Sequence, residues 1–430
     1  MIHALAARIF LGGAVAAFGF LFGRPKAPQP LIDAAELANA GLVQYWQVEL
    51  PTVKGERFGQ LVLIDENVYC VSDRGAVVVV HAPTGVIRWI TELAEPGATI
   101  FEPTHRSSDV CLTTRGKVAL HEQADGKETA LLEIDFVPSA SAVANQQRLY
   151  VPGIDGMLRC LRLSDQVLLW RVRTAQPVVA GPILTTSVLY FASRDGVVHA
   201  CRAQNKVKLW TADLGTPIVA RPGLLARGLL VAGVNGSLYC LDAVSGKLHW
   251  RFRTPGQLRT GPVATKDAIY QYSQDHGLYA VDPATGRQIW QREAGLQFLA
   301  QDGSVAFVLN GLGEIVAVDN KTARQIAVVQ ATNVELAATN PDGPAMFLAD
   351  RGGRLVCVRP AGHPYLRRKE VTAAWRVGPT DSRQEDQLDA SRPAPGKTAL
   401  PPPFDPLRSD DRTPTVAGYR LVPSPAPSRP

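Results

Sequence analysis

The 430-residue sequence has only six cysteines and eight histidines, and none of them falls in a pattern typical of a metal or redox site. No two cysteines are adjacent or spaced as CxxC, and no histidines form HxH or HExxH. These absences argue against a zinc site and a dithiol redox centre. The sequence also lacks GxSxG, a P-loop and a GxGxxG that opens a helix, so it indicates neither a serine nucleophile elbow nor a nucleotide site.

The central part of the chain also lacks an excess of charge of one sign. The formal net charge is +6, and residues 1–30 and 361–430 each contribute +3. Residues 31–360 carry 31 basic and 31 acidic side chains. A protein that binds nucleic acid needs a basic face that displaces counterions from phosphate groups. We therefore predict no nucleic-acid partner.

The sequence does contain a strict spacing of tryptophans. Trp170, Trp210, Trp250 and Trp290 are each 40 residues apart, within strand-like segments separated by turns. A period of this length is typical of a β-propeller with one blade per repeat. The pair Asn235-Gly236, between alternating apolar runs, predicts a type I′ hairpin turn in which both central residues have positive φ.

The turn glycine serves as an anchor that defines eight repeats. The anchors are Gly75, Gly116, Gly156, Gly196, Gly236, His276, Gly313 and Gly353. The position 14 residues after the anchor holds Trp89, Ala130, Trp170, Trp210, Trp250, Trp290 and Ala327 in the first seven repeats. We predict an all-β, eight-bladed β-propeller with four-stranded antiparallel blades. Blades two and seven, which have alanine in this position, are expected to pack more loosely.

The eighth repeat needs a strand from elsewhere to complete its blade. One candidate is the segment 42–50 with Trp46, and the other is the segment around Trp375. The distance from Trp46 to Gly75 is close to the repeat spacing, which favours the N-terminal strand. Closure matters because an open ring would expose edge strands.

The cysteines and several aspartates occupy repeated structural positions. Cys160, Cys240 and Cys357 all lie four residues after their anchors, where other repeats have valine, leucine or alanine. We predict that the thiols are free and buried as small apolar groups. Asp242 and Asp319 end the third strand of their repeats, where a carboxylate can accept hydrogen bonds from the following turn.

The segments on either side of the repeats differ from them in composition. Residues 9–23 are an unbroken apolar run, extendable to residues 4–23, that predicts an anchor helix within residues 1–24. A cleaved signal peptide is the alternative. Residues 25–41 are expected to be a linker with a short helix, and residues 42–360 the propeller. Residues 361–430 hold thirteen prolines and are predicted to be a disordered tail.

The central channel of the disc is the place where a site is expected. The ends of the innermost strands read ATIFEP, PVVAGP, PIVARP and QLRTGP, and the residue before proline varies. Glu102, Arg221 and Arg259 are the charged side chains among them, and we predict them as a candidate binding site at the channel mouth. Solvated groups in a water-filled channel are the alternative interpretation. No catalytic residue, metal ligand or cofactor contact is predicted.

The units YVPGIDGMLRCLRLSDQVLLWRVRT and LVAGVNGSLYCLDAVSGKLHWRFRT resemble the pyrroloquinoline-quinone (PQQ)-like repeat. The resemblance covers about 42–360 and implies an eight-bladed propeller, but it does not distinguish enzymes from scaffolds. PQQ-dependent dehydrogenases are longer, and they have Ca²⁺ ligands and usually a vicinal disulfide. The chain lacks adjacent cysteines and long inserts.

The chain is more similar to the BamB-type scaffold propellers of outer-membrane assembly, although it has no cysteine after the apolar run to carry a lipid. The resemblance implies a non-catalytic, membrane-tethered scaffold on the periplasmic side of a bacterial envelope, without a cofactor and with protein partners. A quinoprotein dehydrogenase is the alternative.

Overall fold

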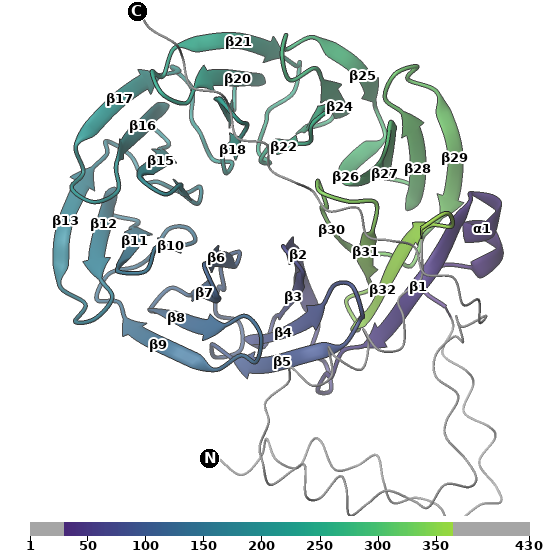
Figure 1. Cartoon of the computed structure of the whole chain (residues 1–430), viewed down its shortest axis with the longest axis horizontal. Helices are drawn as coiled ribbons and strands as arrows, with labels where there is room; N and C mark the ends of the chain where they lie inside the picture. Colours follow the sequence, from purple (N-terminus) through teal and green to yellow (C-terminus); the bar gives the residue numbers. More distant parts are fainter. Residues whose placement is uncertain (1–29, 364–430) are drawn as a thin grey trace, which may run out of the picture.

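The computed structural model describes residues 30–363, which form a ring of eight four-stranded antiparallel sheets (Figure 1). The predicted all-β, eight-bladed propeller is therefore confirmed. The predicted N-terminal anchor and the proline-rich tail lie outside the described residues. Within residues 30–363, no helix is both long enough and apolar enough to cross a membrane.

Each blade has four strands, which we letter A to D from the innermost to the outermost. Blade one consists of β2 (Phe58–Ile64), β3 (Asn67–Ser72), β4 (Ala76–His81) and β5 (Ile87–Glu92), and blade two of β6 (Thr104–Arg106), β7 (Asp109–Thr113), β8 (Lys117–Glu122) and β9 (Glu128–Glu133). Blade three consists of β10 (Val143–Ala144), β11 (Arg148–Pro152), β12 (Met157–Arg162) and β13 (Leu168–Arg173), and blade four of β14 (Ile183–Leu184), β15 (Val188–Ala192), β16 (Val197–Arg202) and β17 (Lys208–Asp213).

Blades five to eight continue the ring in the same order. Blade five consists of β18 (Gly223–Leu224), β19 (Gly228–Ala232), β20 (Ser237–Asp242) and β21 (Leu248–Arg253), and blade six of β22 (Val263–Ala264), β23 (Ile269–Ser273), β24 (Gly277–Val281) and β25 (Gln288–Arg292). Blade seven consists of β26 (Gly295–Asp302), β27 (Val305–Asn310), β28 (Glu314–Asp319) and β29 (Gln325–Gln330), and blade eight of β30 (Leu336–Ala338), β31 (Met346–Ala349), β32 (Arg354–Pro360) and β1 (Leu42–Glu49).

The antiparallel order of the strands gives the disc two distinct faces. The A–B and C–D turns lie on one face, which we call the C–D face. The B–C turns and the connections from strand D to the next strand A lie on the other, which we call the B–C face. A ligand or partner on one face therefore meets a different set of loops from one on the other.

The B–C turns differ from the predicted type I′ geometry. In blade five only Gly236 has positive φ, whereas Asn235 does not, and the amide of Gly236 donates to the carbonyl of Gly233 at 3.1 Å. This pattern fits a type I turn followed by a left-handed glycine. The prediction was wrong because the side chain of Asn235 accepts from the amide of Ser237 and stabilises the turn at negative φ.

Two of the proposed anchors also differ from the expected glycine geometry. In blade six the left-handed residues are Asp275 and Gly277 rather than His276. Gly116 of blade two is not left-handed at all. The repeat count was nevertheless correct, because the period is set by whole strands rather than by any single turn residue.

Each tryptophan of the repeat joins its blade to the next one. The Nε1–H of Trp210 donates to the carbonyl oxygen of Ala243 at 3.1 Å, and its ring lies against Gly246 in the same turn. A Cβ on Gly246 would lie 2.6 Å from the ring, and the φ of this residue is +72°. The corresponding bonds elsewhere run from Trp46 to Ala82, Trp89 to Gln123, Trp170 to Gln204, Trp250 to Pro283 and Trp290 to the side chain of Asn320.

The two blades without this tryptophan are packed by other residues. Ala130 of blade two shares a core with Phe136 and Leu163, and Leu163 stands where the following blades have the smaller Ala203 and Ala243. Ala327 of blade seven shares a core with residues that precede the first strand. The expected loose packing is therefore offset by larger apolar side chains at both positions.

The N-terminal segment closes the ring and covers the gap at blade seven. Strand β1 pairs with β32, and Trp46 faces Cys357, which confirms closure by the N-terminal strand. The segment 25–41 contains a short helix, α1 (Ala34–Asn39), whose Leu37 is buried in the core that includes Ala327. Figure 1 shows α1 outside the ring beside β1 and β29. This segment therefore acts as the missing wedge between blades seven and eight.

The aspartates at the ends of the C strands stabilise the C–D turns, as predicted. The carboxylate of Asp242 accepts from the backbone amide of Ser245 at 2.7 Å, and that of Asp319 accepts from the amide of Thr322 at 2.8 Å. These hydrogen bonds favour the ionised carboxylates, and the side-chain and backbone bonds from Ser245 lower the pKa of Asp242. The aspartates are turn residues.

All six thiols are free and buried, as predicted. Burial raises the pKa of Cys111 and Cys201 to about 11. Because only the thiolate reacts readily, labelling of the native protein should be slow near neutral pH. Denaturation should then release six reactive equivalents, which a colorimetric thiol reagent would count. Rapid labelling of the native state, or a disulfide found by mass spectrometry, would contradict this prediction.

Candidate functional site

The predicted channel-mouth residues lie on the B–C face, in the connections that enter the innermost strands. Glu102 precedes β6 of blade two, and Arg221 precedes β18 of blade five. The sequence predicted that these residues lie at the ends of the innermost strands. In the structure they lie just before the short A strands begin. The A strands line the centre of the disc (Figure 1).

Glu102 and Arg221 are brought together although they belong to blades that are not neighbours. The Nη1 of Arg221 lies 3.8 Å from a carboxylate oxygen of Glu102. Gly181 of the intervening blade four lies beside Arg221, and a Cβ at this position would be in ordinary van der Waals contact, 3.9 Å from the Cδ of Arg221. Ser141 fixes the backbone at Glu102 by donating its hydroxyl to the carbonyl oxygen at 2.8 Å. The channel mouth is therefore spanned by an ion pair.

Arg259 does not join this pair. It is exposed, and its Nε donates to the side chain of Gln257 at 2.9 Å. The side chains of Arg221 and Glu102 are 39% and 48% exposed, so water screens their attraction. Such a pair contributes about 0–1 kcal/mol. The three predicted residues thus form a polar rim to the channel, with one weak link across it.

A second group of hydrogen-bonded polar side chains lies between blades one and two. The Nδ1–H of His105 donates to Asp65 at 2.6 Å, and the hydroxyl of Tyr69 donates to Nε2 of His105 at 2.8 Å. Burial lowers the pKa of His105, and the hydrogen bond to Asp65 opposes this shift. Tyr69 is fully buried, and Tyr150 and Tyr190 use the same hydroxyl to bind backbone carbonyls of the next blade. This row is therefore a contact between blades.

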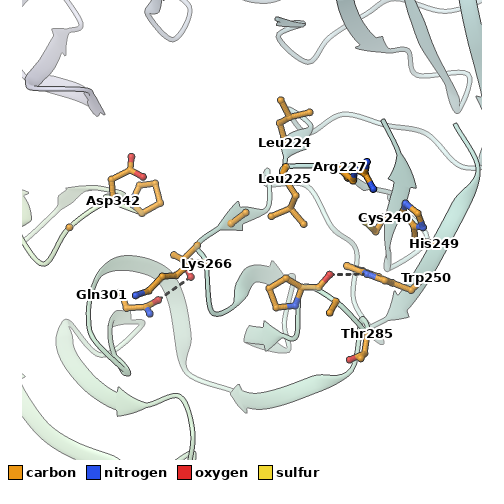
Figure 2. A pocket seen from close by; sticks show the side chains of 18 of the residues that line it. Leu224, Leu225, Arg227, Cys240, His249, Trp250, Lys266, Thr285, Gln301 and Asp342 are labelled. Carbon is orange, nitrogen blue, oxygen red and sulfur yellow. Dashed lines mark hydrogen bonds between the residues drawn. The ribbon is translucent and has the colours of Figure 1, made fainter. Parts of the chain in front are cut away.

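A large hollow lies on the opposite face from the channel-mouth pair. It is a groove of about 1130 Å³ over blades five and six that reaches toward blades seven and eight (Figure 2). Leu224, Leu225 and Trp250 form part of its apolar lining, and Arg227 and Lys266 lie at its edge. Sequence reasoning missed this groove, because the A–B turns that line it have no common motif.

The polar groups of the groove do not form a reactive set. Burial raises the pKa of the Cys240 thiol to about 11, so it is protonated near neutral pH. Gln301 accepts from the hydroxyl of Thr265 at 3.0 Å, and Trp250 is held by its bond to Pro283. Within residues 30–363, no three His, Cys, Asp or Glu side chains are placed to hold a metal ion. The groove is suited to binding an apolar group with polar edges.

Comparisons with known proteins agree with the architecture. A family model described as outer membrane protein assembly factor BamB matches residues 114–221 and 194–360. Among solved structures, BamB from Moraxella catarrhalis superposes with a TM-score of 0.61 at 17% identity, covering 76% of this chain and 99% of that one. The computationally designed Ika8 protein superposes with a TM-score of 0.58 at 13% identity, covering 72% and 99%.

These structural likenesses show the fold alone, because the identities are low. No curated protein sequence matches the chain. The family model is more informative, because its two matches together run from residue 114 to residue 360, which is more than half of the chain. The chain therefore belongs to the family described as outer membrane protein assembly factor BamB.

Proposed function

We propose that this protein is a non-catalytic scaffold in outer-membrane protein assembly, tethered to a membrane by residues 4–23 on the periplasmic side of the envelope. The observation that carries the proposal is the family match over residues 114–360. The architecture supports it, because a closed disc of eight blades presents two loop faces and a rim to partners.

The absence of catalysis is part of this proposal, and the residues that a quinoprotein would need are committed to other contacts. PQQ chemistry requires oxygen ligands for Ca²⁺, an aromatic ring stacked on the quinone and a base, all converging over the channel. The six tryptophans of residues 30–363 each bind the next blade. Glu102 faces Arg221 rather than other oxygen donors. The channel residues therefore do not fit a quinone with its metal.

The B–C face is our candidate for the surface that binds an envelope protein. Ile154 of blade three is 61% exposed and Leu312 of blade seven is 69% exposed, and both stand on B–C turns. Val137 lies beside Ile154, whose amide donates to its carbonyl oxygen, and Leu296 lies near Leu312. Exposed aliphatic side chains on rigid turns are suited to fill pockets on a partner.

Affinity purification of the full chain from detergent-solubilised membranes tests this role. We expect the wild-type chain to retain an envelope protein of the assembly pathway, and Ile154→Ser with Leu312→Ser to reduce its recovery at least about tenfold, as for the loss of central contacts. Val244→Ser, which removes an exposed aliphatic side chain on the C–D face, is the control and should retain the partner. Equal recovery with both variants would place the interface elsewhere.

Reconstitution with PQQ and Ca²⁺ tests the enzyme alternative. We expect no stoichiometric uptake of quinone by absorbance and no turnover in a dye-linked dehydrogenase assay. Uptake together with oxidation of an alcohol or sugar would overturn the scaffold proposal.

A further inference from the structure

Exposed aliphatic side chains gather at one edge of the C–D face. Of the large apolar side chains that are exposed in residues 30–363, half belong to the C–D turns, the starts of the outer strands or the end of an A strand in blades three to five. They are Val167, Leu168, Val207, Leu209, Leu224, Val244 and Leu248, with exposed fractions from 41% to 82%. The corresponding turns of blades one, two and six have no such residues, and that of blade seven has only Ile326.

Basic side chains are interleaved with these aliphatic residues. Arg202, Lys206 and Lys208 of blade four are exposed, as are Arg227 and Lys247 of blade five. None of the five is in an ion pair within the described part of the chain. The acids nearby are already engaged, since Asp165 pairs with Arg162 and Asp242 faces His249 and the amide of Ser245. The edge is therefore both apolar and positively charged.

Net positive charge is also concentrated in the half of the disc that carries this edge. Residues 137–294, which form blades three to six, contain 18 Lys and Arg and 9 Asp and Glu, a net charge of +9. Residues 42–136 and 295–363, which form the other four blades, contain 13 and 20, a net charge of −7. The near-neutral total therefore conceals one basic half and one acidic half, and the ring brings the two acidic segments, 42–136 and 295–363, together.

The chain also enters the disc on this face. Leu42, the first residue of β1, pairs with Pro360, the last residue of the C strand β32, so β1 begins on the C–D face. Helix α1 lies at the rim of the ring, roughly opposite β13 (Figure 1), and Leu31 and Ile32 are buried in the same core as Leu37. The first strand of the disc therefore begins on the face that presents the basic, aliphatic edge.

We propose that the edge formed by the C–D turns of blades three to five lies on an anionic phospholipid surface, an inference that rests on the proposed membrane tether. The aliphatic side chains enter the headgroup region, and the lysines and arginines bind phosphate groups. The tether and this edge hold the C–D face toward the bilayer. The B–C face, with Ile154 and Leu312, is then turned toward soluble partners.

The orientation is measurable with an environment-sensitive dye on a single introduced cysteine, because the six native thiols are buried. Full-length Val244→Cys, labelled with NBD, is reconstituted into vesicles of phosphatidylcholine alone or with phosphatidylglycerol. We expect a blue shift and a gain of emission with phosphatidylglycerol only. Leu312→Cys is the matched control on the B–C face and should show no change.

Charge reversal tests whether the edge contacts the bilayer through electrostatic attraction or only because the chain is tethered nearby. In the Val244→Cys background, Lys208→Glu with Lys247→Glu should abolish the blue shift, because each basic residue near an anionic surface contributes about fivefold to binding. Lys321→Glu with Arg324→Glu, an equal change in the C–D turn of blade seven, should leave the shift intact. Raising NaCl from about 0.1 M to about 0.5 M shortens the Debye length from about 10 Å to about 4 Å and should also reduce the shift.

The outcomes distinguish this inference from the proposed function. A chain that floats with both kinds of vesicle, but whose dye at position 244 responds no more than at position 312, retains its tether and overturns the docked orientation. Loss of the shift in both charge-reversed pairs would also overturn it, since the effect would then follow total charge. A chain that floats with neither kind of vesicle overturns both the tether and the docking, and an acidic protein surface becomes the occupant to test for this edge.

Discussion

A chain that lacks residues 1–50 should lose most of its stability, because β1 is the outer strand of blade eight and its removal opens the ring. The deletion removes the pairing of β1 with β32, the contact of Trp46 with the turn at Gly85 and the burial of Leu37. We expect the free energy of unfolding to fall by at least about 5 kcal/mol, comparable with the whole stability of many domains. Thermal unfolding followed by circular dichroism would measure the loss.

The matched control for this deletion is a chain that lacks residues 1–29 only. It keeps α1 and β1, so it should melt close to the full-length protein. A chain that lacks residues 364–430 should behave in the same way. If the 1–50 deletion melts normally and the C-terminal deletion unfolds, a strand around Trp375 completes the ring instead.

Trp210→Ala should lower the free energy of unfolding by about 3–5 kcal/mol, in the range of buried aromatic truncations. The ring is 7% exposed, lies against Gly246 of the next blade and donates to Ala243. The substitution therefore leaves a cavity at a blade interface and removes a hydrogen bond. Urea denaturation followed by fluorescence would measure the change, and Trp210→Phe, which keeps part of the ring, should lose less.

A double-mutant cycle tests whether this cost arises at the contact with Gly246. Gly246→Ala alone should be destabilising, because its Cβ would lie 2.6 Å from the ring and its φ is +72°. In the double variant, the clash with the ring is absent and only the backbone strain at position 246 remains. The loss of unfolding free energy should therefore be smaller than the sum of the two single losses. Additive losses, or an equal loss on Ala130→Ser, would show that the repeat positions are misaligned.

Blade seven combines one feature that the sequence predicted with one that it could not. The 40-residue spacing predicted the blades, and Ala327 marked the place where the tryptophan is missing. The sequence could not show that Leu37, some 290 residues away, lies in the same core. The spacing also predicted that the cysteines are buried, because the same strand-interior position takes a small apolar side chain in every repeat.

The candidate sites were also predicted only in part from the sequence. The variable residues before proline could be read from the chain, since each blade contributes one connection to the channel. Their pairing could not, because Arg221 of blade five reaches Glu102 of blade two past two intervening blades. The groove and the basic edge were also missed, because their residues come from turns that share position but not sequence.

The sequence by itself determined the number of blades and the burial of the thiols, and it favoured the N-terminal strand for closure, because these follow from a local pattern repeated along the chain. Only the tertiary structure decided which side chains meet across the channel, how α1 fills the gap at Ala327 and how the two acidic segments of the chain meet in one half of the ring. These features depend on the order of the blades around a closed ring, which brings distant residues together and separates charges that a simple sum would cancel.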